Sequence, residues 1–346
     1  MMTTDFSSFR QASGPLVDVR SPGEFHQGHW PGAINLPLFS DEQRAEVGTT
    51  YKKNGRAQAI DLGLELVGPA LATMSRQLKE IAGGAEHLRI YCWRGGMRSN
   101  SVAWLAGLVD LKPLVLDGGY KSYRRWVLEQ FGQPWPVKLI GGRTGSGKTD
   151  LLLAMAARDV AVVDLEGLAH HRGSSFGGLG LPDQPSTEHY ENRLAEALDG
   201  HRQSGATEIW LEAESAQVGR CRIPRDLFMQ MQATEVLEVR RSLEERINQL
   251  VEVYGHQGSE ALADATHRIS RRLGPQRTRQ ALDAIACADW HGASRAMLDY
   301  YDRCYDHELE RAVERRTVSI EGLSPDQAAD HLLSEGFVQR IPSTGH

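Results

Sequence analysis

The sequence lacks the features that mark membrane, secreted and cysteine-framework proteins. No apolar run approaches the roughly 20 residues that a membrane helix needs, and the first residues lack the basic-then-apolar pattern of a secretory signal. Cysteine is scarce: the 346 residues include four, and no two are spaced as a zinc or disulfide pair. We therefore expect a cytoplasmic protein with no membrane partner, whose cysteines remain thiols.

A large excess of one charge is also missing. The formal net charge is −6; residues 1–137 contribute +2 (15 Lys and Arg against 13 Asp and Glu) and the remainder −8 (24 against 32). This balance argues against a protein that coats nucleic acid along its length, although a local patch can still bind RNA. The stretch 268–279 has no acidic residue, and its candidate RNA contacts are Arg268, Arg271 and Arg272. A solvated helix face explains the same pattern about as well.

Short apolar segments alternate with helix-compatible sequence along the chain. We expect strands at 16–19, 88–91, 114–116, 137–140, 160–163, 208–211, 234–239 and 318–320. This alternation predicts an α/β protein in which helices cover both faces of parallel sheets. Residues 242–316 are mostly helical in pattern and carry no comparable strand.

The strongest domain boundary is the segment 132–137. Two prolines and a glycine within it break any helix. We expect a first domain over 1–131, a linker over 132–137, and a second α/β domain with a helical extension over 138–346.

Cys92 ends a predicted strand and opens a glycine-rich turn that leads into a helix. The backbone N–H groups of such a turn and the N-terminus of the following helix favour a thiolate over a thiol. Two arginines add positive charge, and two glycines let backbone donors close around an anionic adduct on sulfur. The loop around the thiol comprises Arg94, Gly95, Gly96, Met97, Arg98 and Ser99. The pattern predicts a catalytic cysteine that accepts a sulfur-like or phosphorus-like centre.

Residues 5–131 resemble the rhodanese family of sulfurtransferases. The shared motifs are Asp18-Val19-Arg20, Glu24-Phe25, the segment 28–37, the Cys92 loop, and Leu116-Asp117-Gly118-Gly119 with Trp126. The resemblance implies that Cys92 carries sulfur as a persulfide cradled by the loop. The spacing from Cys92 to Arg98 also fits the C-x5-R motif of dual-specificity phosphatases, one residue longer than the usual sulfurtransferase loop. Those phosphatases have His before the cysteine, whereas this chain has Tyr91, so we favour chalcogen transfer over phosphate ester hydrolysis.

A phosphate-binding motif follows the boundary. The pattern Gly142-x4-Gly147-Lys148-Thr149 satisfies Walker A in full and lies between a predicted strand and a predicted helix. Backbone N–H groups and the helix N-terminus hold phosphate oxygens in such a loop, Lys148 neutralises charge, and the Thr149 hydroxyl can ligate Mg²⁺. The expected phosphate-binding residues are Gly142, Thr144, Gly145, Ser146, Gly147, Lys148 and Thr149.

Residues beyond this loop are less specific candidates. Asp164 follows a predicted strand and is the favoured acidic partner of a metal, with Glu212 and Glu214 as rivals, while the metal itself stays unassigned. His171 and Arg172 belong to a polar loop that could close over a ligand. An ordinary solvent-facing loop is a serious alternative, and paired histidines alone do not indicate a metal site.

The two motifs in this order, with the segment 165–174, resemble the bacterial tRNA 2-selenouridine synthase family nearly from end to end. The resemblance implies a rhodanese-like parallel-sheet domain followed by a P-loop NTPase-like α/β domain with a helical C-terminal region. It implies selenium replacing sulfur in a tRNA with 2-thiouridine at the wobble position, from selenophosphate, through an S-geranylated intermediate made from geranyl diphosphate. No tightly bound cofactor is expected, and Mg²⁺ is possible.

This resemblance assigns one step to each motif. Cys92 would accept selenium from selenophosphate, and the Walker A loop with Lys148 would hold the diphosphate of geranyl diphosphate. Two alternatives stay open on the residues alone. One is a P-loop phosphotransferase that spends ATP and uses the rhodanese-like domain as a binding module, and the other is a cysteine-dependent phosphatase.

Overall fold

The computed structural model describes residues 3–309 and 314–342 and divides them into two compact units. The division lies between Glu129 and Gln130, inside helix α7 (Gly119–Phe131) and just ahead of the expected linker. Each unit is built on its own parallel sheet, which confirms the α/β class. No helix among the described residues is both long enough and apolar enough to cross a membrane.

The first unit has a five-stranded parallel sheet in the order β1-β5-β4-β2-β3. Its strands are β1 (Thr3–Thr4), β2 (Leu16–Asp18), β3 (Ile34–Asn35), β4 (His87–Tyr91) and β5 (Lys112–Leu116). Its other helices are α1 (Phe6–Gln11), α2 (Pro22–Gln27), α3 (Asp41–Asn54), α4 (Arg56–Val67), the 3-10 turn η1 (Gly68–Ala70), α5 (Leu71–Ala82) and α6 (Met97–Gly107).

Side chains of β4 alternate between two apolar layers because successive residues of a strand point to opposite faces. Leu88 and Ile90 join one core cluster with residues of α5 and α6. Tyr91 stacks on Tyr120 of α7 in a separate aromatic group. Helices thus cover both faces of the sheet, as a buried parallel sheet requires.

The second unit has a four-stranded parallel sheet in the order β11-β10-β6-β7. These strands are β6 (Val137–Gly141), β7 (Ile209–Glu212), β10 (Val236–Arg240) and β11 (Arg315–Ser319), and a small antiparallel pair joins β8 (Gln217–Val218) to β9 (Cys221–Arg222). The strand expected at 160–163 is wrong: only an isolated bridge, Val162 to Trp210, forms there. The apolar segment is too short to form a longer strand, because Asp164 directly after it is the N-cap of α9.

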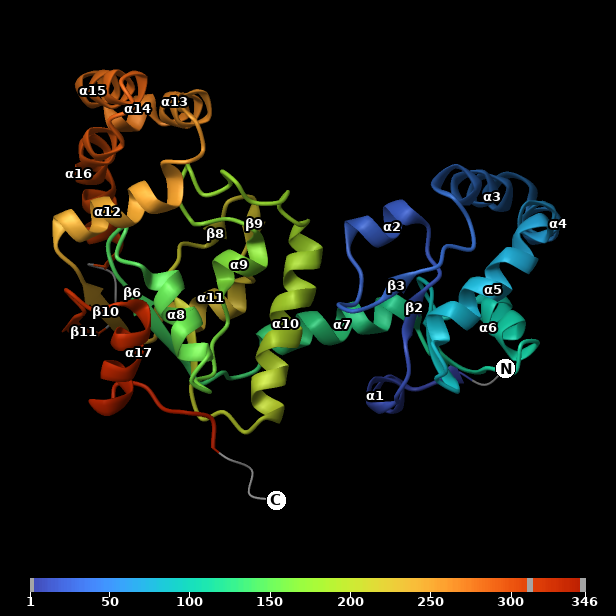
Figure 1. The fold of residues 1–346 in the computed structure, drawn as a ribbon. Helices are drawn as coiled ribbons and strands as arrows, with labels where there is room; N and C mark the ends of the chain where they lie inside the picture. Colours follow the sequence, from blue (N-terminus) through green and yellow to red (C-terminus); the bar gives the residue numbers. More distant parts are fainter. Residues whose placement is uncertain (1–2, 310–313, 343–346) are drawn as a thin grey trace. The chain divides into compact units, whose positions relative to one another are not determined.

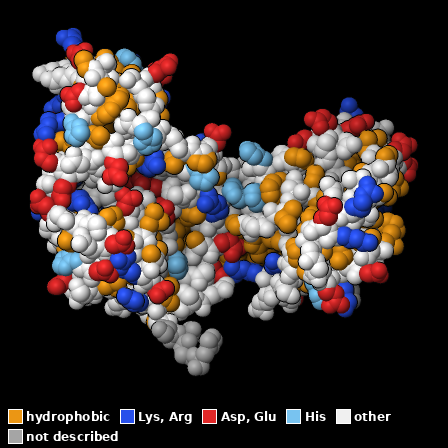
Figure 2. Space-filling model, viewed as in Figure 1, with side chains coloured by type: hydrophobic (Ala, Val, Ile, Leu, Met, Phe, Trp, Pro, Cys, Tyr) orange, Lys and Arg blue, Asp and Glu red, His pale blue; other side chains and the backbone are white. Residues whose placement is uncertain are grey.

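The described residues of this unit form ten helices. They are α8 (Lys148–Ala156), α9 (Leu165–Ala169), α10 (Thr187–Gln203), α11 (Arg225–Gln232), α12 (Leu243–Tyr254), α13 (Ser259–Arg268), α14 (Ser270–Leu273), α15 (Pro275–Ala286), α16 (Trp290–Leu309) and α17 (Pro325–Ser334). Helices α8 and α17 lie side by side in Figure 1 and share one apolar core with the sheet. Helices α13 to α16 form a second apolar cluster, which accounts for the helical pattern of 242–316. Acidic and basic side chains are interspersed over the face of this unit drawn in Figure 2.

Candidate functional site

Cys92 follows the last residue of β4 and lies at the carboxyl edge of the first sheet. Its side chain is 3% exposed, and its Sγ lies 3.2 Å from Oγ of Ser99, the last residue of the loop. Its carbonyl oxygen accepts a hydrogen bond of 2.8 Å from the amide of Tyr120 at the start of α7. Cys92 is therefore held at two points: its thiol contacts α6, and its carbonyl oxygen binds the start of α7.

Glycine is required where the loop meets this turn. Gly119 has a φ of +57°, and a Cβ there would lie 2.3 Å from the carbonyl oxygen of Cys92. Gly95 has a φ of +67°, and its Cβ would lie 2.3 Å from the carbonyl oxygen of Leu116. Side chains at these positions would push the thiol loop away from the turn.

Arg98 is paired, which the sequence did not predict. Its Nη1 lies 2.6 Å from Oε2 of Glu24, and its Nη2 lies 3.3 Å from Oε1. Burial acts to raise the pKa of Glu24, but the hydrogen bond and charge of Arg98 outweigh it and lower the pKa overall. Arg94, by contrast, is exposed at the surface of the loop. Part of the positive charge expected around the thiol is thus balanced by Glu24.

A buried ion pair at the end of β2 supports the thiol loop indirectly, through α7. Nη2 of Arg20 lies 2.7 Å from Oδ2 of Asp18, and both side chains are almost fully buried. The guanidinium of Arg20 lies 3.7 Å from the ring centre of Tyr120. This contact ties the end of β2 to the start of α7, which in turn binds the Cys92 carbonyl.

The phosphate loop joins β6 to α8 as the Walker A pattern predicts. Gly145 and Gly147 have φ values of +81° and +75°, a region that glycine occupies without strain. Nζ of Lys148 donates a hydrogen bond of 2.7 Å to the carbonyl oxygen of Gly142, across the mouth of the loop. Ser146 is fully buried, and its Oγ has no hydrogen-bond partner among the described residues. The loop therefore has the curvature of a phosphate cradle.

Two arginines from distant segments brace this loop. Nε of Arg241 donates to the carbonyl oxygen of Ser146 at 3.1 Å, and Nη1 of Arg246 donates to that of Thr144 at 3.3 Å. Arg246 also makes two hydrogen bonds to Asp302, of 2.6 and 2.7 Å. No local sequence pattern marks these contacts, because the partners are 56 to 102 residues apart.

Glu166 occupies the position expected for Asp164 beside the Walker A threonine. Oγ1 of Thr149 donates to Oε2 of Glu166 at 2.7 Å, whereas Asp164 accepts from the amide of Gly167 and caps α9. Burial raises the pKa of Glu166, with the charge of Lys148 opposing it. Burial also raises the pKa of Glu212 well above its ordinary range, and this side chain accepts from the amide of Leu165.

The donor set at this point suits a small hard cation only in part. Thr149 and Glu166 offer a hydroxyl and a carboxylate oxygen, which are ligands that Mg²⁺ accepts alongside phosphate oxygens and water. No group of three or more His, Cys, Asp or Glu side chains in 3–309 and 314–342 is arranged to hold a metal by itself. A Mg²⁺ ion would therefore depend on a bound phosphate for most of its ligands.

The loop that carries His171 and Arg172 packs against the second unit's helical cluster. Phe176 of this loop is buried among residues of α13 to α16. Arg172 donates to the carbonyl oxygen of Leu179 at 3.2 Å, and the amide of His171 donates to that of Glu166 at 3.0 Å. Burial lowers the pKa of His171, which favours its neutral ring. The loop is thus linked to the backbone of Glu166, whose carboxylate lies beside the phosphate cradle.

The three candidate RNA contacts lie apart from both loops in the sequence. Arg268 ends α13, and Arg271 and Arg272 belong to α14. All three side chains are exposed. Their role in binding RNA stays a prediction.

The fold and the two loops define a protein in which a rhodanese-like unit precedes a P-loop unit. A model of the rhodanese-like domain matches residues 4–125, and a model described as the tRNA 2-selenouridine synthase AAA domain matches residues 135–332. The chain belongs to the tRNA 2-selenouridine synthase family.

Relatives with this name align along most of their length. The tRNA 2-selenouridine synthase of Hahella chejuensis is 37% identical, and the alignment covers 90% of each chain. That of Shewanella loihica is 36% identical over 88% of this chain and 90% of its own. That of Bordetella petrii is 35% identical over 91% of this chain and 92% of its own.

Proposed function

We propose that this protein is a cytoplasmic tRNA-modifying transferase that replaces the sulfur of wobble 2-thiouridine with selenium. The observation that supports the proposal is that one chain of this family contains both the thiol loop and the phosphate loop, each held by hydrogen bonds of its own. The substrates are the thiolated tRNA, geranyl diphosphate and selenophosphate. Each loop serves one chemical step.

The phosphate loop serves the alkylation step. Its backbone amides and Lys148 bind the diphosphate of geranyl diphosphate and neutralise it as it leaves. The thiocarbonyl sulfur of the uridine attacks C1 of the geranyl group, the C1–O bond breaks, and diphosphate departs. Mg²⁺, when bound by Thr149 and Glu166, would supply further neutralising charge.

The thiol loop serves the selenium step, although Cys92 does not itself accept selenium in this proposal, in contrast to the expectation from the family resemblance. Attack of the Cys92 thiolate on selenium would release phosphorus at the level of phosphite, so that route needs an oxidant to regenerate phosphate. Attack on phosphorus balances instead: an S–P bond forms, the P–Se bond breaks, and selenide leaves. The C-x5-R spacing of Cys92 and Arg98 is typical of enzymes that attack phosphorus in this way. Water then hydrolyses the S–P bond and releases phosphate.

Selenide completes the exchange at the base. It attacks C2 of the S-geranylated uridine, the C2–S bond breaks, and geranyl thiol leaves. Alkylation makes this possible because a neutral thioether sulfur leaves more readily than a thiocarbonyl sulfur. Arg268, Arg271 and Arg272 are proposed to contact the tRNA backbone, since exposed arginines bind phosphates without reading sequence.

The test is incubation of the full-length protein with thiolated tRNA while substrates are omitted one at a time. Mass analysis of the wobble nucleoside should find 2-selenouridine only when geranyl diphosphate and selenophosphate are both present. Geranyl diphosphate alone should give the S-geranylated nucleoside. ATP turnover without tRNA, or hydrolysis of an aryl phosphate with no selenium transfer, would contradict the proposal.

A further inference from the structure

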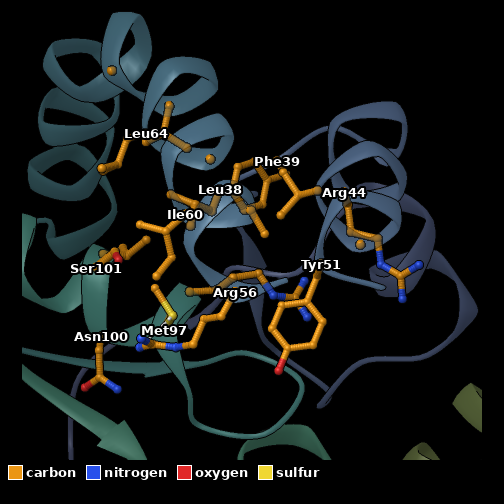
Figure 3. A pocket seen from close by; sticks show the side chains of 18 of the residues that line it. Leu38, Phe39, Arg44, Tyr51, Arg56, Ile60, Leu64, Met97, Asn100 and Ser101 are labelled. Atoms are coloured by element: carbon orange, nitrogen blue, oxygen red, sulfur yellow. Dashed lines mark hydrogen bonds between the residues drawn. The ribbon is translucent and has the colours of Figure 1, made fainter. Parts of the chain in front are cut away.

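A large apolar pocket adjoins the thiol loop in the first unit. It has a volume of about 1040 Å³, slightly above the usual range for small-molecule sites, and lies among α3, α4, α5 and α6. Its lining includes Tyr51 of α3, Ile60 and Leu64 of α4, and Met97 of the thiol loop (Figure 3). The pocket therefore shares a residue with the loop that holds Cys92.

The rim of this pocket is basic. Arg44, Lys52, Arg56 and Arg98 contribute to its lining, and none of the described lining residues carries a carboxylate. Glu24, outside the lining, balances part of this charge through Arg98 and Arg44. Nη2 of Arg56 lies 3.8 Å from the sulfur of Met97, so the rim reaches the thiol loop. An apolar interior with a cationic rim suits a hydrocarbon chain attached to an anionic group.

Two of the helices that line the pocket, α3 and α4, have few buried residues in the ligand-free protein. Helix α3 buries no residue and α4 buries only Ala59. Tyr51, Leu64 and Met97 are 58%, 66% and 53% exposed although their side chains are large and apolar. A cluster of exposed apolar side chains around a pocket marks a binding site, because a ligand would remove that surface from water.

A second cavity borders the same loop and is basic. An open groove of about 910 Å³ is lined by Arg94 of the thiol loop and by Lys121, Arg124 and Arg125 of α7, with Glu129 as its one acidic residue. Such a groove suits the phosphates of a nucleic acid. The thiol loop therefore contributes Arg94 to a basic groove and Met97 to an apolar pocket.

We propose that the pocket binds the hydrocarbon chain carried on sulfur by the alkylated nucleoside, while the RNA backbone lies along the groove. This inference rests on the proposed function, which supplies a chain of about ten carbons on a polyanion. Seating the chain beside Met97 would bring the nucleoside to the Cys92 loop. It would also retain alkylated RNA in preference to RNA that has not yet been alkylated. Burying even part of such a chain corresponds to a preference on the order of a hundredfold in Kd.

The test compares two anticodon stem–loop RNAs that differ only at the wobble base. One carries 2-thiouridine and the other S-geranyl-2-thiouridine, and their Kd values for the full-length protein are measured by fluorescence anisotropy. The wild type should bind the geranylated RNA about a hundredfold more tightly. Ile60→Trp, which fills the pocket, should bring the two Kd values to within about threefold without changing that of the thiolated RNA. Gln58→Trp is the matched control, because Gln58 is exposed on the same helix and lies outside the lining.

A second pocket variant keeps the test valid if Ile60→Trp does not fold. Leu64→Asp changes a side chain that is already mostly exposed, so it should fold normally and still abolish the preference. An unchanged preference in both pocket variants would overturn the inference, as would a change of oligomeric state in them, which would make the pocket a protein interface. Selenium incorporation by the wild type is measured separately. Its absence would contradict the proposed function, whereas the loss of chain preference in the variants tests the pocket alone.

Discussion

Arg98 of the thiol loop is held by Glu24, with Nη1 and Oε2 only 2.6 Å apart. Glu24 lies in the first turn of α2 and forms a capping box with Ser21, so contacts from two elements fix its carboxylate. The guanidinium is therefore oriented but not fully available to a bound anion. An anion at Cys92 depends mainly on backbone N–H groups unless it competes with Glu24.

Glu24→Gln should separate the effect of Glu24 on anion binding from its effect on stability. It removes the balancing charge, so selenophosphate should bind about two- to fivefold more tightly, while the protein loses about 1 kcal/mol of unfolding free energy. Isothermal titration calorimetry and urea unfolding at pH 7 measure the two changes. Glu80→Gln, an exposed carboxylate of α5, is the control.

The pH dependence of this variant has a definite sign. The pKa of Glu24 is lowered in the folded protein from its ordinary value of 4.5, so its stabilising effect is present above pH 4.5. It is lost as the pH falls through the lowered pKa. The wild type and Glu24→Gln should therefore converge in unfolding free energy at low pH, and a constant difference would contradict the assigned ion pair.

Gly119→Ala should disturb the thiol loop directly. The new Cβ would approach the Cys92 carbonyl oxygen to 2.3 Å at a positive φ, so we expect a loss of about 2–4 kcal/mol in unfolding free energy. Gly84→Ala is the matched control, since Gly84 has a φ of +91° with nothing within 4 Å of its Cβ, and should lose about 1 kcal/mol. Equal losses of unfolding free energy in the two variants would show that the close approach of Gly119 to the Cys92 carbonyl oxygen does not stabilise the loop.

Glu166→Gln should reveal a carboxyl group that resists ionisation. Burial raises its pKa from the ordinary value of 4.5, so ionisation costs the folded protein stability as the pH rises through the raised value. Glutamine keeps an acceptor for Thr149 but has no proton to lose. The unfolding free energy of the wild type should therefore fall relative to that of the variant as the pH rises above 4.5 towards the raised pKa. A relative rise would place the pKa below its ordinary value.

Lys148→Ala should weaken the binding of geranyl diphosphate. Loss of one charged hydrogen-bond donor to a phosphate corresponds to about 10- to 100-fold in Kd, and geranylation should fall at least as far. Titration calorimetry and mass analysis of the nucleoside measure the two. Lys148→Arg should recover part of the affinity, because it restores the charge with a different shape. Geranylation at the wild-type rate in Lys148→Ala would separate the Walker A loop from the alkylation step.

Both loops could be predicted because their signals are local. A strand, a glycine turn and a helix follow one another at Cys92 and again at Gly142, and the structure forms each as expected. Contacts between distant segments gave no such signal. Glu24 and Arg98 are 74 residues apart, and nothing near either residue indicates the pair.

Two further features escaped prediction for physical reasons. Asp164 and Glu166 are separated by one residue, and only the start of α9 decides which of them reaches Thr149. Helices α3 and α4 have no apolar stripe packed in a core, so periodicity could not reveal the pocket that they wall. A surface that binds a ligand can leave its apolar residues exposed in the ligand-free protein.

The central claim is that selenium transfer needs Cys92 and alkylation does not. The direct measurement is mass analysis of the wobble nucleoside after Cys92→Ala is incubated with thiolated tRNA, geranyl diphosphate and selenophosphate. We predict S-geranyl-2-thiouridine without 2-selenouridine. Formation of 2-selenouridine by Cys92→Ala at the wild-type rate would contradict the account.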